Sequence, residues 1–122
     1  MRINFSSQTP IFVQVQQGLE DEILSGVYQE GEQIPSITEL AASYKINPAT
    51  ALKGINLLVD AGIVYKKRGI GMFVCEGALQ KLTQKRQEEF FTQYVLPLVQ
   101  EVKRLSISPE QLREWIERGL SQ

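Results

Sequence analysis

The chain has 122 residues, with 13 Lys and Arg, 14 Asp and Glu, no His and one Cys. This length fits one ordinary domain with a small appendage, and a hydrophobic content of 43% allows a core to form. The composition excludes catalysis by histidine and metal sites built on imidazole, and the lone Cys75 can form neither an internal disulfide nor a multi-thiolate metal site. We therefore expect no enzyme, no cofactor and no metal.

No segment resembles a signal peptide or approaches the roughly 20 apolar residues that span a bilayer. The single thiol indicates a reducing compartment, because disulfides are used mainly in oxidising compartments. We expect a cytoplasmic protein that makes no membrane contact.

The first half of the chain predicts helices in close succession. Thr9 and Pro10 suit the N-cap and first position of a helix that runs to Gly26, with apolar residues every three or four positions. Residues 28–34 are typical of a loop with a short strand at 33–34. A capping box then begins a short second helix, in which Ser36 and Glu39 would satisfy each other's backbone amides. Its buried side comprises Ile37, Leu40, Ala41 and Tyr44.

A tight turn at residues 45–46 leads into a third helix, because Asn47 is a good N-cap and Pro48 is tolerated at the first helical position. Gly62 is placed to end this helix in a left-handed conformation. The inner face carries Ala51, Ile55 and Leu58, and the outer face carries Ala49, Thr50, Lys53 and Asn56. The outer face is short, polar and free of acids until Asp60.

The rest of the chain predicts a hairpin and further helices. β-Branched and aromatic residues indicate strands at 63–65 and 72–75, joined by the basic turn Lys66-Lys67-Arg68-Gly69-Ile70-Gly71. A helical pattern resumes after Gly77, with a kink or break expected at Pro97, and Ser108 caps a final short helix. The fold class is therefore mainly α with a small β-hairpin: a winged helix-turn-helix domain over residues 1–77 and a short two-helix region over residues 78–122.

A helix-turn-helix places the N-terminal residues of its second helix in a DNA major groove. Free amides at the helix N-termini near Ser36 and Asn47 favour a phosphate, while Thr50 and Lys53 suit a base edge or a phosphate. The basic hairpin tip can follow the adjacent minor groove. Each feature has a plainer interpretation, since capping boxes are common and a short basic run is by default a solvated tip. Their conjunction favours DNA binding.

Several segments carry a family resemblance: Thr9-Pro10-Ile11-Phe12 with Gln14, Ile23-Leu24-Ser25-Gly26, Gly31-Glu32-Gln33-Ile34-Pro35-Ser36, Glu39-Leu40-Ala41, Ile46-Asn47-Pro48-Ala49-Thr50, Leu58-Val59-Asp60-Ala61-Gly62 and Arg68-Gly69-Ile70-Gly71-Met72-Phe73-Val74. Over roughly residues 4–75 they closely resemble the winged helix-turn-helix of GntR-family bacterial transcription regulators. The short carboxyl-terminal part resembles the YtrA-type subfamily. The resemblance implies a regulator of transcription, and members of this subfamily often sit beside genes for the transporters they control.

Two positions depart from the family pattern. The family usually reads P-S-x-R-E-L, with an arginine that contacts DNA, where this chain has Thr38. A polar residue commonly follows the T-V pair of the recognition helix, where this chain has Leu52. Leu52 has two interpretations, contact with a thymine methyl or packing against a neighbouring helix. Both departures leave fewer charged contacts, which bears on operator sequence and affinity more than on the fold.

The residues after Gly77 are too few for the ligand-binding domains of larger relatives. Their apolar side chains exceed what two short helices can bury alone, which predicts a symmetric partner. The residues assigned to this dimer interface are Phe90, Phe91, Tyr94, Leu98, Trp115 and Ile116. Two alternatives are that they fold back on the amino-terminal domain in a monomer, or that the aromatics line a small-molecule pocket. No residue pattern identifies an effector.

The resulting hypothesis is a homodimeric, sequence-specific DNA-binding regulator, with repression as the expected activity. The helix from Pro48 would enter the major groove of a pseudo-palindromic operator in double-stranded DNA. The expected DNA contacts are Ser36, Thr38, Asn47, Ala49, Thr50, Lys53, Lys67, Arg68 and Gly69. The alternative from another class is a winged-helix protein-interaction module with reduced or lost DNA binding.

The net charge of −1 argues against a nucleic-acid binder until it is divided along the chain. Residues 1–39 carry −5, residues 40–75 carry +4 and residues 76–122 are balanced. The positive charge therefore lies on the predicted recognition helix and wing. A small basic footprint on an acidic body should depend on dimerisation for its affinity.

Overall fold

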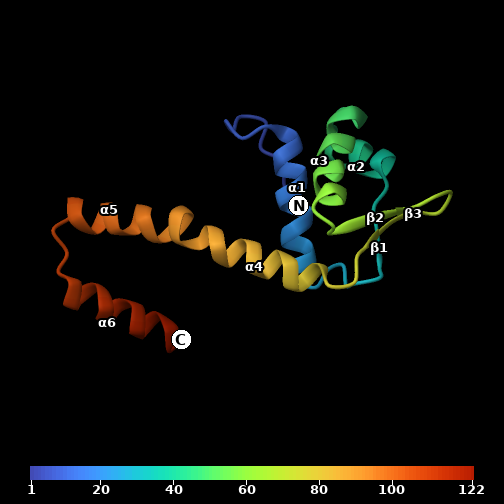
Figure 1. Cartoon of the computed structure of the whole chain (residues 1–122). Coiled ribbons are helices and arrows are strands. Elements are labelled where there is room, and N and C mark those ends of the chain that lie inside the picture. The colour runs from blue at the N-terminus through green and yellow to red at the C-terminus, as the bar shows by residue number, and fades with distance from the viewer. The chain divides into compact units, whose positions relative to one another are not determined.

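A computed structural model describes all residues of the chain, from Met1 to Gln122 (Figure 1). The chain divides into two compact units, residues 1–84 and residues 85–122. The division falls after Gln84 rather than after Gly77, because Ala78 and Leu82 are fully buried in the core of the first unit. None of the helices combines the length and the apolar character that crossing a bilayer requires.

The helical part of the first unit consists of α1 (Ile11–Leu24), α2 (Ile37–Tyr44) and α3 (Pro48–Asp60). α3 packs against both α1 and α2, as Figure 1 shows. The apolar stripes that the sequence predicted meet in this core, where Val15 and Leu19 of α1 are fully buried. The α3 side of the contact is formed by Ala51, Ile55 and Leu58, all with no exposed surface. The predicted inner face of the third helix is thus confirmed.

The start of α1 differs from the prediction that Thr9 caps it. Pro10 is the N-cap residue, and no side chain caps the helix. Instead, Gln14 in the first part of α1 holds the preceding segment. Its Nε2 donates to the carbonyl oxygens of Asn4 and Thr9, each at 2.9 Å, and its Oε1 accepts from the Asn4 amide at 2.7 Å. A side-chain amide therefore fixes this end of the helix in place of the threonine hydroxyl.

A three-stranded antiparallel sheet in the order β1-β3-β2 completes the first unit. It comprises β1 (Gln33–Ile34), β2 (Val64–Lys67) and β3 (Gly71–Val74). Val64 pairs with Val74 and Lys67 with Gly71. Lys66 and Lys67 therefore lie in β2, and the turn itself spans only residues 68–70. The inner face closes the core through Ile34, Val64, Met72 and Val74. The mainly helical fold with a small hairpin is confirmed, as is the short strand at 33–34.

The remaining helices are α4 (Ala78–Phe90), the π-helical turn η1 (Phe91–Val95), α5 (Leu96–Arg104) and α6 (Pro109–Leu120). A break at Pro97 was one expected outcome, yet α4, η1 and α5 follow one another without a gap. The Leu96 amide bonds to the Phe91 carbonyl five residues back, which widens the helix just before the proline ring and its missing N–H. α6 starts as predicted, with the Ser108 hydroxyl accepting from the Gln111 amide at 3.1 Å.

The close approach of α1 and α3 depends on Gly54. A Cβ at this position would lie 2.7 Å from the Phe12 carbonyl oxygen and 2.9 Å from the Val15 Cβ. We expect Gly54→Ala to lower the free energy of unfolding by about 1–3 kcal/mol through overpacking, although alanine favours helices. Gly119→Ala in α6, where a Cβ meets nothing within 4 Å, should not destabilise the protein. Denaturant unfolding followed by circular dichroism measures both, and equal stabilities would contradict the role of Gly54.

Candidate nucleic-acid interface

The turn between α2 and α3 is fixed by three consecutive residues. Lys45 ends α2 in the left-handed region, with φ of +55°. Ile46 packs into the core, and its amide donates to the Ala41 carbonyl at 3.1 Å. Asn47 caps α3, with Pro48 at the first helical position, as predicted. Local sequence therefore sets the short turn that a helix-turn-helix requires.

The two helix N-termini differ in the amides that they leave free. At α3, the Asn47 side chain accepts from the Ala49 amide at 2.8 Å and the Asn47 carbonyl accepts from the Thr50 amide at 2.9 Å. The free amides expected near Asn47 are therefore occupied. At α2, the capping box takes the amides of Ser36 and Glu39, whereas the first two helical amides have no acceptor within the helix. An anion thus finds donors at α2 and not at α3.

The outer face of α3 is open to solvent. Ala49, Leu52, Lys53 and Asn56 are exposed, and Thr50 is half-buried. The Lys53 ammonium lies 4.0 Å from the centre of the Phe12 ring, a cation–π contact that holds this charge at the junction of α1 and α3. Leu52 keeps 41% of its surface exposed and is not among the side chains packed against the core, so part of its surface is open to a partner.

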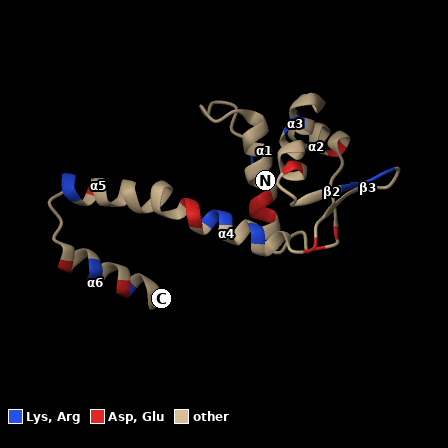
Figure 2. Ribbon diagram, in the orientation of Figure 1, with Lys and Arg blue, Asp and Glu red and all other residues tan.

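The wing formed by β2, β3 and their turn carries a run of exposed cations, coloured blue in Figure 2. Lys66 and Lys67 are held in β2, while Arg68 lies in the turn next to Gly69, whose φ is +77°. Gln33 of β1 supports this turn, because its Nε2 donates to the Ile70 carbonyl at 3.2 Å. No sequence pattern predicted this role of Gln33, since Gln33 and Ile70 are 37 positions apart.

The outer side of the wing is aromatic as well as basic. Tyr65 and Phe73 stack with ring centres 5.7 Å apart, and the Lys67 ammonium lies 5.1 Å from the centre of the Phe73 ring. These contacts limit the conformations of a side chain that would otherwise be mobile. Lys67 therefore presents its charge from a defined place on the strand.

A groove of about 420 Å³ lies between the start of α2 and the wing. It brings together four of the predicted DNA contacts, Ser36, Thr38, Lys67 and Gly69, and adds Lys66. The other predicted contacts lie outside this groove, on α3 and at the wing tip: Asn47, Ala49, Thr50, Lys53 and Arg68. The groove joins the charges of Lys66 and Lys67 to the start of α2, where Glu39 also lines it and accepts from the Ser36 amide, so a phosphate would bind through the lysines and the free amides of α2.

Glu30 fastens the start of α4 to the loop before β1. Its Oε1 accepts from the Gly77 amide at 2.8 Å and its Oε2 from the Leu79 amide at 3.1 Å. The bond from Gly77, followed by that from Leu79, lowers the pKa of the Glu30 carboxyl because both stabilise its charged form. The sequence does not single out Glu30, because its partners are nearly fifty residues away. The first turn of α4 is thus fixed to the winged unit.

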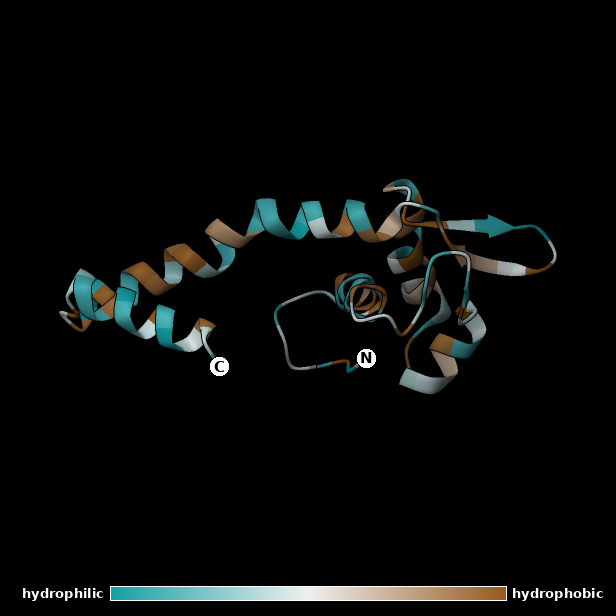
Figure 3. Ribbon diagram, turned by 90° about the horizontal axis from the view of Figure 1, so that it is seen from below, coloured by the Kyte–Doolittle hydropathy of each residue, from teal (hydrophilic) through white to brown (hydrophobic).

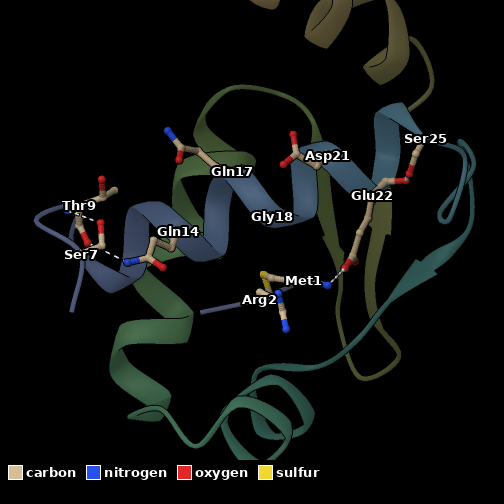
Figure 4. Close-up of a pocket in the computed structure, with 10 residues that line it drawn as sticks. All are labelled: Met1, Arg2, Ser7, Thr9, Gln14, Gln17, Gly18, Asp21, Glu22 and Ser25. Carbon is tan, nitrogen blue, oxygen red and sulfur yellow. Dashed lines mark hydrogen bonds and ion pairs between the residues drawn. The ribbon is translucent and has the colours of Figure 1, made fainter. Parts of the chain in front are cut away.

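A polar pocket of about 600 Å³ lies between the N-terminal segment and α1 (Figure 4). The Met1 ammonium donates to Glu22 Oε1 at 2.8 Å, and the Gln14 Nε2 donates to the Thr9 carbonyl at 2.9 Å. None of the residues predicted to contact DNA or a second subunit lines this pocket.

The predicted dimerisation residues all lie in the second unit, residues 85–122. Phe90 ends α4, Phe91 and Tyr94 lie in η1, Leu98 lies in α5, and Trp115 and Ile116 lie in α6. All six are 42–61% exposed, and brown, hydrophobic turns mark this part of the chain in Figure 3. The rings of Phe90 and Tyr94 have centres 5.4 Å apart, so they form a continuous apolar surface. α6 packs extensively against no other helix or strand.

Residues 12–74 match the sequence model of the gntR family of bacterial regulatory proteins. The chain is 29% identical over 116 residues to the HTH-type transcriptional repressor YtrA of Bacillus subtilis. The aligned region covers 95% of this chain and 88% of YtrA. Several other curated regulators match over 64–87 residues, and the chain spans only 26–36% of their length.

Solved structures show the same fold. A putative GntR-family transcriptional regulator from Bacteroides thetaiotaomicron has a TM-score of 0.73 and 30% identity, over 91% of this chain and 96% of that one. BusR of S. agalactiae, solved in complex with its busAB-promotor DNA, has a TM-score of 0.60 and 23% identity, over 93% of this chain and 54% of BusR. The family match spans more than half of the chain, so this protein belongs to the gntR family of bacterial regulatory proteins and is a DNA-binding transcription regulator of YtrA type rather than an enzyme.

Proposed function

We propose that the protein is a homodimeric repressor that binds a pseudo-palindromic operator. Each subunit inserts the N-terminal half of α3 into a major groove and lays its wing along the adjacent minor groove. The observation that carries this proposal is the exposed start of α3 on a firmly packed unit whose wing bears Lys66, Lys67 and Arg68. The repressor activity of YtrA and the promoter DNA bound to BusR support it.

The contacts divide into two kinds. Backbone phosphates are assigned to the wing and to the groove between the wing and the start of α2, because charged side chains and free amides lie there. Bases are assigned to α3, whose outer face is exposed from its first turn. The residues proposed to contact DNA are Ser36, Thr38, Asn47, Ala49, Thr50, Lys53, Lys67, Arg68 and Gly69.

The second copy covers the apolar surface of residues 78–122. Phe90, Phe91, Tyr94, Leu98, Trp115 and Ile116 stay exposed in a single chain, and burying aromatic side chains of this size is a main source of dimer stability. The weak packing of α6 on its own chain leaves that helix free to pack on a partner. The amino-terminal unit, with α4 anchored by Glu30, then binds one half-site per subunit. Such a regulator acts in the cytoplasm, on the cell's own DNA.

A selection from random duplexes with the full chain at low salt, followed by footprinting, tests this proposal. We expect an enriched inverted repeat whose half-site centres lie about one helical turn, or a small multiple of it, apart. Enrichment of no sequence would contradict DNA recognition. It would instead favour a protein-interaction module, in which Thr38 in place of the family arginine marks the loss of DNA binding.

A further inference from the structure

We propose that Leu52 determines operator specificity by contacting the C5-methyl group of thymine in the major groove. This inference rests on the proposed function, because it assigns a partner to one side chain of the DNA-facing surface. At this position the family commonly has a polar residue, whereas the contact proposed for Leu52 is apolar. The operator half-site should therefore contain at least one thymine whose methyl group adds to affinity.

Leu52 lies on the side of α3 that turns away from the core. It follows Ala49 by three residues and precedes Asn56 by four, and residues so spaced share one helix face. All three are exposed, whereas Ala51 and Ile55 on the opposite face have no exposed surface. Leu52 therefore belongs to the same surface as the residues assigned to the major groove.

The surroundings of Leu52 select the kind of partner. Lys53 follows it directly, and residues 40–75 as a whole carry +4, so this surface attracts a polyanion rather than an apolar protein face. Leucine offers neither a hydrogen-bond donor nor an acceptor, so it cannot read the polar edge of a base. In the major groove, the thymine methyl is the apolar group that distinguishes one base from the others. Ala49, with a methyl side chain on the same face, extends the apolar strip.

The expected effect follows from the size of the group. Burying one methyl-sized group changes the binding constant roughly four-fold. This equals a binding free energy of about 0.8 kcal/mol, because each ten-fold in the binding constant is about 1.4 kcal/mol. A contact of this kind is insensitive to salt, because no counterion is released when it forms. It is therefore separable from the phosphate contacts of the wing.

The experiment uses deoxyuridine, which differs from thymidine only by the absence of the methyl group. Starting from the operator selected with the full chain, each thymine of the half-site is replaced in turn, and affinity is measured by fluorescence anisotropy at fixed salt. We expect one or two positions at which the unsubstituted protein loses roughly four-fold in affinity. Leu52→Ala should bind the thymine operator more weakly and bind the thymine and uracil duplexes equally.

Lys53→Ala is the matched control, because it alters the neighbouring side chain on the same exposed face. It should weaken binding to both duplexes and keep their ratio. Thermal unfolding of Leu52→Ala checks that the exposed substitution leaves the fold intact. Equal binding of thymine and uracil duplexes by the unsubstituted protein, or a ratio that survives Leu52→Ala, would overturn the inference while operator binding stands. If no operator is selected at all, the proposed function fails together with this inference.

Discussion

Replacing Phe91 and Tyr94 together by aspartate is expected to convert the proposed dimer to a monomer and to weaken operator binding by about 10²-fold or more. Both side chains lie in the π-helical turn and are 57% and 61% exposed in a single chain. Two carboxylates within the proposed apolar interface cannot be desolvated without a large cost in free energy. A monomer then contacts one half-site at a time and loses the gain from simultaneous binding.

Light scattering and titration of two duplexes measure this result. The double variant should have half the mass of the unsubstituted protein, yet bind an isolated half-site as well as the unsubstituted protein does. Val27→Asp is the control, because Val27 is an equally exposed apolar residue, at 58%, in the other unit. It should leave the mass unchanged. A dimer that persists in the double variant would place the interface in the amino-terminal unit.

The parts of the fold that follow from neighbouring residues were predictable. The capping box of Ser36 and Glu39, the cap at Asn47 and the left-handed Gly62 all depend on contacts within a few residues, and all are present. The apolar spacing of α1 and α3 likewise gave the buried faces, because helical periodicity converts directly into a face. At the start of α1 the same reasoning chose Thr9, where the longer Gln14 side chain makes the bonds.

The ties between distant segments were not predictable from one sequence. Glu30 lies in a polar loop and Gln33 in the two-residue strand β1, and no local pattern shows that one caps α4 and the other supports the wing turn. Leu82 is a further case, because its place in the core of residues 1–84 is visible only when the helices are packed. Within the candidate site, the sequence predicted the outer face of α3, which is exposed, but not that Asn47 would occupy the amides at the start of α3.

Removing the two wing cations by Lys67→Ala and Arg68→Ala is expected to flatten the salt dependence of operator binding. Each lost phosphate contact reduces the slope of log affinity against log salt by about 0.9, so a dimer that loses four contacts changes by about 3.6. The ratio of the operator affinity of the unsubstituted protein to that of the variant should therefore fall about a hundred-fold between 50 mM and 200 mM salt. The loss should be similar for every duplex, because phosphates carry no sequence information.

A charge-matched control separates contact from bulk charge. Lys103→Ala with Arg113→Ala removes the same two positive charges from exposed positions of the second unit, so it should leave the slope unchanged if the variant remains dimeric. Equal slopes for the wing variant and the unsubstituted protein would make the wing a solvated turn. The salt dependence would then be assigned to Lys45, Lys53 and Lys66, which are the remaining cations of residues 40–75, and to the amides of α2.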